Sequence, residues 1–470
     1  MWLFLTILLA VSHHALGTNP GLESVITQKA LEYAKQVGAS LAQEQLGGLA
    51  IPDITGSISI FPFGKVDYSL SGMHVVDFNL PEPEVGFAEE AGVKIGISGM
   101  SVAIHGTWRD RYHLIRDSGS FDLAVYGLTV SVLVGVGSDS TGHLIVSSAN
   151  CDASVADLEV TLHGSTRWLY KPFTNKIKDL AHKQLNRKLC PMISEYIDGL
   201  EPLLQKINVS YQYDPYVVFE FPLIHPPAIG TSNMEFDCKG EFYSVEHRKE
   251  FPFTPELFQL HDQNHMVSVG LSQSSANSAG FAYHSAGVLW IRLTDSMIPK
   301  VSPIRLNTTS FESFVPELPK RYPDMLMLVD LFSSQQPLIT FQPDNVTAQA
   351  FGSAKVYVIL PNATLVPVFV LDICVSFSAK LFMSGLKLTG SMTLNNVSLN
   401  LASSELGPFQ TKSMENVIRA GIHLVVLPKV NAKLKRGIPL PATPKVSLVN
   451  PVLKVNQGFV MLATDISYSP

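Results

Sequence analysis

The chain has 470 residues, of which 46% are apolar and 16% charged, and its formal net charge is −6. This length exceeds what one hydrophobic core usually supports, so two domains are expected, and the apolar content excludes a disordered protein. Residues 18–210 contain 15 Lys and Arg against 21 Asp and Glu, whereas residues 211–470 contain 19 of each. This balance excludes a protein that acts through a broad cationic face, so any recognition of anions must be local.

The first 17 residues, MWLFLTILLAVSHHALG, carry an apolar run of about ten residues that ends in a small-x-small cleavage pattern. The run is too short to span a bilayer, and later apolar stretches such as Leu365–Val375 alternate like strands. The sequence therefore predicts a signal peptide at 1–17 and a secreted, extracellular protein without a transmembrane helix. Storage in granules stays open.

Secretion permits both glycosylation and disulfides. Four cysteines allow three complete pairings, of which a strand-to-helix link between Cys151 and Cys190 is one, and Cys238 and Cys374 can equally be free thiols. The predicted glycosylation acceptors are the Asn-x-Ser/Thr positions Asn208, Asn307, Asn345, Asn362 and Asn396.

The first half predicts a helix followed by a meander of strands. Apolar residues recur every three or four positions from Leu22 to Leu46, which is the spacing of one helix face. Alternating stretches follow at residues 58–60, 93–97, 100–104, 121–125, 128–134 and 158–162, separated by Gly or by Asp and Ser. A second helix is expected from Lys171 to Lys206, with a kink or break at Pro191 and Pro202.

Prolines cluster between Val217 and Glu256, and the same order of elements then recurs. Strands are expected at 287–293 and 355–401, a proline-interrupted helix at 311–332, a helix at 412–422 and a last strand at 458–468. The predicted domains are an amino-terminal domain at 18–215, a central proline-rich linker at 216–256 and a carboxy-terminal domain at 257–470.

A curved sheet wrapped around a long amphipathic helix leaves an apolar gap wherever the two do not pack fully. Such a gap can hold a lipid chain, because each buried methylene contributes about 0.8 kcal/mol; the alternative is an ordinary core. No cofactor is expected, and a bound lipid is the ligand that such a gap would hold. The residues predicted to line the gap are Leu22, Ile26, Val37, Leu41, Ile177 and Leu185.

Catalytic and metal motifs are absent from the sequence: there is no G-x-S-x-G, H-E-x-x-H, P-loop or C-x-x-C. His261 and His265 are four apart, a spacing that binds metal on a helix, but the polar, proline-flanked context favours a solvated loop. We therefore expect a protein that is not an enzyme and has no metal site, and nothing indicates nucleic-acid binding.

Residues 107–116, TWRDRYHLIR, form a small cationic segment. In a strand, Arg109, Arg111 and His113 share one side, and Trp108 and Tyr112 share the other. Arginine forks bind phosphates bidentately, and amphipathic rings settle at lipid–water boundaries. A solvated hairpin that prevents edge pairing is the alternative. Lys65, Lys94 and an apolar FPFG turn at residues 61–64 supplement the segment.

Six stretches, taken together, resemble the family of bactericidal/permeability-increasing protein and lipopolysaccharide-binding protein, with its lipid-transfer relatives. They cover essentially the whole mature chain. The stretches are NPGLESVITQKALEYAKQ (19–36), IPDITG (51–56), SGSFDL (118–123), KGEFYS (239–244), AGVLWIRLTDSMIPK (286–300) and LPKVNAKLKRGIPLP (427–441).

The resemblance implies an α+β fold: a boomerang of two pseudo-symmetric antiparallel β-barrels, each wrapped around a long amphipathic helix, joined by a central sheet. It implies a disulfide between Cys151 and Cys190 and an apolar phospholipid pocket in each half. The family's lipopolysaccharide-binding positions at the tip of the first barrel match Lys65, Arg109, Arg111, His113 and Arg116. The acidic first half departs from the strongly cationic bactericidal members.

The expected function is binding of lipopolysaccharide, through lipid A, in innate immunity, with antibacterial or lipopolysaccharide-presenting activity. Trp108 and the FPFG turn are expected to contact acyl chains, and Lys94 to supplement the basic tip. The expected partners are lipopolysaccharide, phospholipids, the bacterial outer-membrane surface and host lipopolysaccharide receptors. A plasma phospholipid transfer protein is the alternative function, and a structural or odorant-type carrier is a third.

Overall fold

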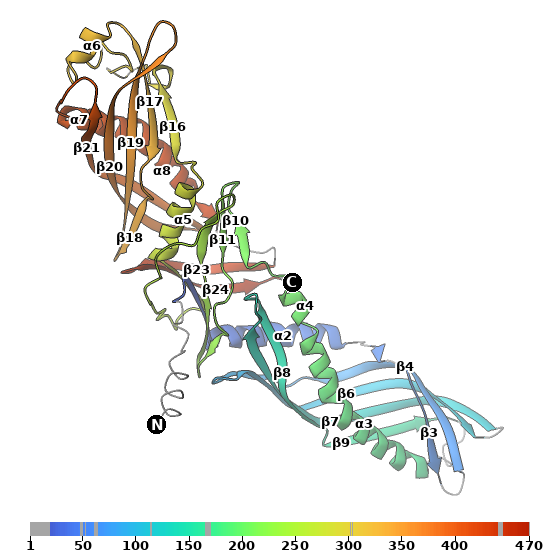
Figure 1. Cartoon of the computed structure of the whole chain (residues 1–470). Coiled ribbons are helices and arrows are strands. Elements are labelled where there is room, and N and C mark those ends of the chain that lie inside the picture. The colour runs from blue at the N-terminus through green and yellow to red at the C-terminus, as the bar shows by residue number, and fades with distance from the viewer. Residues whose placement is uncertain are drawn as a thin grey trace, which may run out of the picture. The chain divides into compact units, whose positions relative to one another are not determined.

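The computed structural model describes residues 19–47, 50–51, 53–60, 64–112, 115–164, 171–300, 302, 304–439 and 445–469. They form two compact units (Figure 1). Among these described residues, the amino-terminal unit contains those from 26 to 207 and from 226 to 236, and the carboxy-terminal unit contains those from 19 to 25, from 208 to 225 and from 237 to 469. The predicted signal peptide lies outside the described residues.

One antiparallel eight-stranded sheet dominates the amino-terminal unit. Strands β2, β4, β6, β7 and β8 lie side by side in that order, while β3 pairs with β4, β5 with β6 and β9 with β7. The predicted run of antiparallel strands is confirmed, but the pairing of β4 with β6 and of β9 with β7 makes the sheet more than a simple meander. The strands are β2 (Ala50–Ile51), β3 (Ile54–Ile60), β4 (Gly64–Asn79), β5 (Glu84–Ala88), β6 (Gly92–Tyr112), β7 (Ile115–Ser138), β8 (Leu144–Ser154) and β9 (Asp157–His163). A short hairpin of β12 (Ala228–Ile229) and the first residues of β13 (Asn233–Cys238) completes the unit's strands.

These strands are fewer and longer than the sequence predicts. Residues 93–97 and 100–104 belong to the single strand β6, and the register with β7 shifts between Ile97 and Met100, where Gly99 has φ +79°. Residues 121–125 and 128–134 are likewise one strand, with Gly127 at φ +61°. Glycine in a strand interior accommodates a bulge at little steric cost, so it does not have to end the strand.

The first helix begins later than predicted. Residues Leu22–Thr27 form strand β1, in which every second residue is buried, and helix α2 runs from Gln28 to Leu46. The segment SVIT is rich in β-branched residues, which favour a strand. The helical spacing therefore applies only from Gln28 onward.

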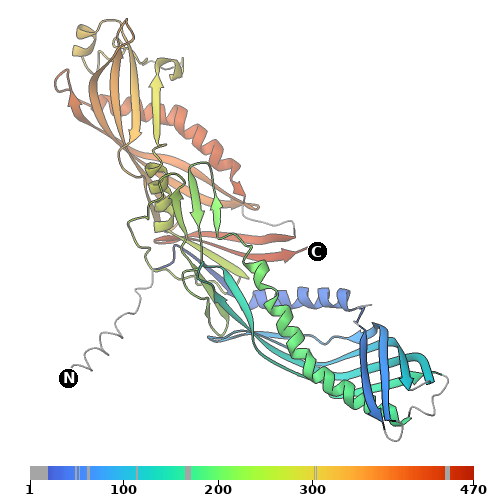
Figure 2. The same ribbon diagram turned by 45° about the vertical axis from the view of Figure 1, so that its right-hand side comes forward.

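Helix α3 (Lys171–Asp198) lies along the sheet and contacts β8 and β9 (Figures 1 and 2). Of the two alternatives expected at Pro191, a kink or a break, the break is wrong, because the helix continues through this residue. Tertiary bonds offset the hydrogen bond that proline removes: the disulfide between Cys151 and Cys190 is confirmed, and Ser194 Oγ donates to Ser148 Oγ at 2.9 Å. The helix ends before Gly199, and Pro202 lies in the first turn of α4 (Glu201–Leu204), where its missing N–H costs nothing.

The carboxy-terminal unit contains three antiparallel strand groups, which the strand order gives as β1-β15-β24-β23, β10-β11-β14 and β16-β17-β19-β20-β21-β22, with β18 beside β19. Its strands are β10 (Ser210–Gln212), β11 (Val217–Glu220), β14 (Glu241–Ser244), β15 (Val267–Ser272), β16 (Trp290–Thr294), β17 (Leu326–Ser333), β18 (Leu338–Gln342), β19 (Asn345–Ile359), β20 (Leu365–Ser384), β21 (Lys387–Ser404), β22 (Ile438–Pro439), β23 (Val446–Val455) and β24 (Phe459–Tyr468). Helices and antiparallel sheets together confirm the α+β class. Over the described residues neither long sheet closes, so the predicted closed barrels are not confirmed.

Three helical segments of this unit differ from expectation. Only Glu317–Arg321 of the predicted 311–332 helix is helical (α6), because prolines flank it and β17 begins at Leu326. The predicted 412–422 helix is instead a continuous run of α7 (Lys412–Gly421), a π-helical turn (Ile422–Val426) and α8 (Leu427–Arg436), against β21. Helix α5 (Gln273–Ser285) escapes prediction because it is rich in Ser and Ala. A 3₁₀ turn occupies Asp295–Met297.

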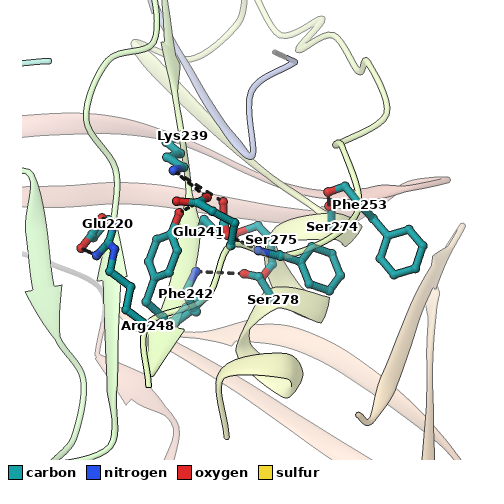
Figure 3. Close-up of polar contacts among 12 residues, drawn as sticks. Glu220, Lys239, Glu241, Phe242, Arg248, Phe253, Ser274, Ser275 and Ser278 are labelled. Carbon is teal, nitrogen blue, oxygen red and sulfur yellow. Dashed lines mark hydrogen bonds and ion pairs between the residues drawn. The ribbon is translucent and has the colours of Figure 1, made fainter. Parts of the chain in front are cut away.

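The KGEFYS stretch fixes the loop that follows it (Figure 3). Tyr243 is fully buried, and its hydroxyl donates to Glu250 Oε2 at 2.8 Å, which Lys239 Nζ also contacts at 3.0 Å. The Arg248 guanidinium lies 4.0 Å from the Tyr243 ring centroid and forms two hydrogen bonds with Glu220. Segment 216–256, predicted as a linker, is thus built of short strands and a firmly bonded loop.

Candidate functional site

The basic positions of the candidate site meet at one end of the β6–β7 hairpin. Arg111 lies directly opposite Arg116 on β7 and opposite Asp67 on β4, and Lys65 lies two residues before Asp67. Arg109 lies opposite Ser69 and Ser118. The side chains of Lys65, Arg109 and Arg111 are exposed. Cross-strand partners share one face of a sheet, so the register gathers these cations on the same face.

Acidic residues limit the net charge of this hairpin end. Asp67 is exposed opposite Arg111, and Asp110 lies opposite Asp117. Strand alternation puts Asp110 on the other face from Arg109 and Arg111. A ligand on the arginine face therefore meets guanidinium forks rather than a broad positive potential. His113 and the Phe61–Phe63 part of the FPFG turn lie outside the described residues.

Trp108 is buried, so the exposed position at a lipid–water boundary that was predicted for its ring is wrong. The residue is only 5% exposed and packs with Val66, Met73 and Phe121. Its indole Nε1 donates to the carbonyl oxygen of Ser120 at 3.0 Å and to that of His163 at 3.3 Å. Because the arginine face points to solvent, the opposite face, which carries Trp108, is the interior of the unit.

Lys94 is exposed but belongs to the other end of β6, where it pairs with Gly86 and Leu133. Fifteen residues of strand separate it from Arg109, which corresponds to roughly 45–50 Å. Its predicted contribution to the basic hairpin end is therefore wrong. The sequence did not show that residues 92–112 form one long strand, so it did not reveal that Lys94 and Arg109 lie near opposite ends of it.

A row of imidazoles on the arginine face is a feature that the sequence did not indicate. His105 Nδ1 donates to Asp122 Oδ1 and His163 Nε2 donates to Asp122 Oδ2, both at 2.7 Å. The His74 ring meets the His105 ring edge-on, with centroids 5.8 Å apart. Hydrogen bonds from His105 and His163 lower the pKa of the Asp122 carboxyl. Only the strand register brings these four residues together.

Comparison with known proteins places this geometry in a family. The model of the LBP / BPI / CETP family amino-terminal domain matches residues 30–203, and that of its carboxy-terminal domain matches residues 211–468. The chain belongs to the LBP / BPI / CETP family. The resemblance noted in the sequence is therefore confirmed.

Relatives of this family match the whole chain. A bactericidal permeability-increasing protein of Sebastes schlegelii is 38% identical, over 100% of this chain and 99% of that protein. The human lipopolysaccharide-binding protein is 32% identical, over 99% of this chain and 97% of that protein. A crystal structure of lipopolysaccharide-binding protein superposes with a TM-score of 0.58 at 28% identity, covering 96% of this chain and 99% of that one.

The family's phospholipid pocket stays a prediction for this chain. Leu22 belongs to the carboxy-terminal unit and Ile26 to the amino-terminal unit, while Val37 and Leu41 lie half-buried on α2. The structure describes the backbone of Ile177 and Leu185 in α3 but not their side chains. The described part of the chain therefore does not gather these six residues into one site within either unit.

The HDQNH motif lies in a loop, as its polar context favours. The Asp262 carboxylate accepts hydrogen bonds from the backbone N–H of Asn264 and His265, and from His265 Nδ1 at 3.0 Å. These bonds hold the His265 ring on its own turn. Among the described residues, no group of three His, Cys, Asp or Glu side chains has the arrangement of a metal site.

The glycosylation acceptors differ in exposure. Asn208, Asn362 and Asn396 are exposed, whereas Asn307 and Asn345 are half-buried. Cys238 and Cys374 are free thiols, and burial raises the pKa of Cys238 to about 12. None of the described helices combines the length and apolar content that a membrane crossing requires.

Proposed function

We propose that this protein binds lipopolysaccharide of Gram-negative bacteria in innate immunity, through the basic end of the β6–β7 hairpin. The observation that carries the proposal is the register, which puts exposed Arg109 and Arg111 on one face of β6, with Arg111 opposite Arg116 of β7, in a chain of this family. Guanidinium forks bind phosphate oxygens bidentately. The lipid A phosphates are the ligand groups that this arrangement fits.

Phosphate pairing at an exposed site supplies only part of the affinity. Each exposed contact contributes at most about 1 kcal/mol and weakens with salt. Four such contacts give about 4 kcal/mol, whereas micromolar binding needs about 8 kcal/mol. The difference corresponds to burial of about five acyl methylenes. Since Trp108 is buried, we assign this apolar part to the FPFG turn and to the predicted phospholipid pocket between helix and sheet.

We further propose that the chain is secreted after loss of residues 1–17, is glycosylated and carries bound phospholipid. Its partners are lipopolysaccharide, phospholipids and the bacterial outer-membrane surface, with host lipopolysaccharide receptors where the lipid is presented. Two activities are compatible with the same site: killing by disruption of the outer membrane, and presentation of the lipid to a host receptor.

The test is binding of the mature protein to immobilised lipopolysaccharide at 50 and 150 mM salt, with neutral phosphatidylcholine vesicles as the reference surface. The double variant Arg109→Ala, Arg111→Ala is expected to bind lipopolysaccharide more weakly, by up to about thirtyfold, because it loses two contacts of at most about 1 kcal/mol each. Lys94→Ala is the matched control, because it removes an exposed cation from the same strand far from the hairpin end. Equal binding of wild type and double variant would refute the site. Equal binding to lipopolysaccharide and to phosphatidylcholine would favour the alternative function, phospholipid transfer.

A further inference from the structure

The imidazole row crosses four neighbouring strands of the amino-terminal sheet. His74 on β4 lies opposite His105 on β6, His105 lies opposite Asp122 on β7, and His163 on β9 reaches the same carboxylate. The side chains of His105, Asp122 and His163 are 40%, 54% and 49% exposed. The row is therefore open to a ligand from solvent.

This row continues the arginine face. Residues 105, 107, 109 and 111 of β6 alternate onto one side, and the register with β7 has no shift between His105 and Arg111. Four residues separate His105 from Arg109, about 13 Å of strand. The hydroxyls of Ser71 and Thr107, 3.0 Å apart, lie between the two groups. The result is one polar strip with cations at one end and imidazoles at the other.

His105 and His163 share one carboxylate, Asp122, whereas His74 Nδ1 lies 3.1 Å from the carbonyl oxygen of Gly72. Histidine side chains change charge between pH 5 and 8, and each Asp122 oxygen is already occupied by one ring.

Other charged groups also face the row: Arg109 on β6, Asp77 on β4, Glu159 on β9, and Asp53, which accepts from the Gly72 N–H beside His74. Asp157, further along β9, is engaged by Lys178 of α3 at 2.6 Å. Protonation of the three imidazoles changes the charge of the strip by up to three positive units.

We propose that His74, His105 and His163 form a second anion subsite, which binds phosphate groups of the lipopolysaccharide headgroup when the imidazoles are protonated. This rests on the proposed lipopolysaccharide binding at the arginine end, and it adds that the affinity for lipopolysaccharide increases in a mildly acidic medium. The hydroxyls between the two subsites face the sugar that links the phosphates. Three exposed charge contacts correspond to a gain of roughly five- to thirtyfold in affinity.

The experiment compares the dissociation constant for immobilised lipopolysaccharide at pH 7.4 and pH 5.5, in 150 mM salt with EDTA. Wild type is expected to bind five- to thirtyfold more tightly at pH 5.5, although phosphate monoesters themselves lose charge there. The triple variant His74→Gln, His105→Gln, His163→Gln is expected to lose this gain and to keep its affinity at pH 7.4. His143→Gln is the matched control, because that ring pairs with Asp139 and Thr141 at a distant turn of the same unit.

A second variant separates charge from folding damage. Asp122→Asn removes the shared negative charge and is expected to strengthen binding at pH 5.5, whereas damage to the sheet would weaken it. A wild type without gain at pH 5.5, or a triple variant that keeps the gain, overturns the second subsite while the arginine site stands. Absence of binding at both pH values overturns the proposed function together with the subsite.

Discussion

Substitution of Trp108 separates two accounts of the basic hairpin. If Trp108 were an acyl-contacting anchor, its removal would weaken lipid binding and leave stability unchanged. The structure gives the opposite expectation, because the ring is 5% exposed and packs with Val66, Met73 and Phe121. Truncation of a buried aromatic residue to Ala costs about 3–5 kcal/mol. Trp108→Ala is therefore expected to lower the free energy of unfolding by about that amount.

Trp108→Phe gives a finer test of the same interior. Phenylalanine keeps the apolar contacts but removes the Nε1 donor to the Ser120 and His163 carbonyl oxygens, which lie at 3.0 and 3.3 Å. Loss of these hydrogen bonds costs about 0.5–1.5 kcal/mol each. The assay is urea unfolding followed by circular dichroism, with lipopolysaccharide binding measured on the folded variant. Unchanged stability with reduced binding in both variants would refute the interior placement.

Four further predictions follow from contacts elsewhere. Cys151→Ser opens a link over 39 residues and should cost about 4 kcal/mol in urea unfolding on the chain-entropy model. Tyr243→Phe removes the 2.8 Å hydrogen bond to Glu250 and should lower the free energy of unfolding by about 1–2 kcal/mol. Hydrogen bonds from His105 and His163 lower the pKa of Asp122, so this carboxylate stabilises the fold above the ordinary aspartate pKa, and the stabilisation is lost as pH falls through the folded-state pKa. Asp122→Asn should therefore make the urea midpoint depend less on pH between pH 5 and 2. In secreted protein, glycopeptide mass spectrometry should find higher occupancy at exposed Asn362 than at half-buried Asn345.

The sequence predicted the strand character of residues 92–138 and the separation of Trp108 from the arginines onto opposite faces. Alternation alone did not say which of those faces is buried. The apolar partners of Trp108, namely Val66, Met73 and Phe121, come from two other strands, β4 and β7. Their contribution becomes visible only when the strand register is known.

Other misses have different physical causes. The helix was predicted to begin at Leu22 because Leu22 and Ile26 are four residues apart. That spacing fits one face of a helix and also alternate positions of a strand, so the β-branched residues of SVIT were given too little weight. Helix α5 lacks large apolar residues at helical spacing, and its N-cap, the Ser272 hydroxyl accepting from the Ser275 N–H, is a signal shared by many turns. The imidazole row joins residues 74, 105, 122 and 163, and no local pattern links positions so far apart.

The charge distribution bears on how a lipid-binding site can act in this chain. Disruption of a membrane by charge requires a wide positive potential, whereas residues 18–210 carry six more acidic than basic residues. Beyond about 8 Å at physiological salt the individual arginines are screened, so Arg109 and Arg111 act only on groups that they touch. Contact-range phosphate pairing combined with acyl burial favours capture of single lipid molecules. If that is the mode of action, lipid extraction from vesicles should respond to the loss of Arg109 and Arg111 while leakage of vesicle contents should not.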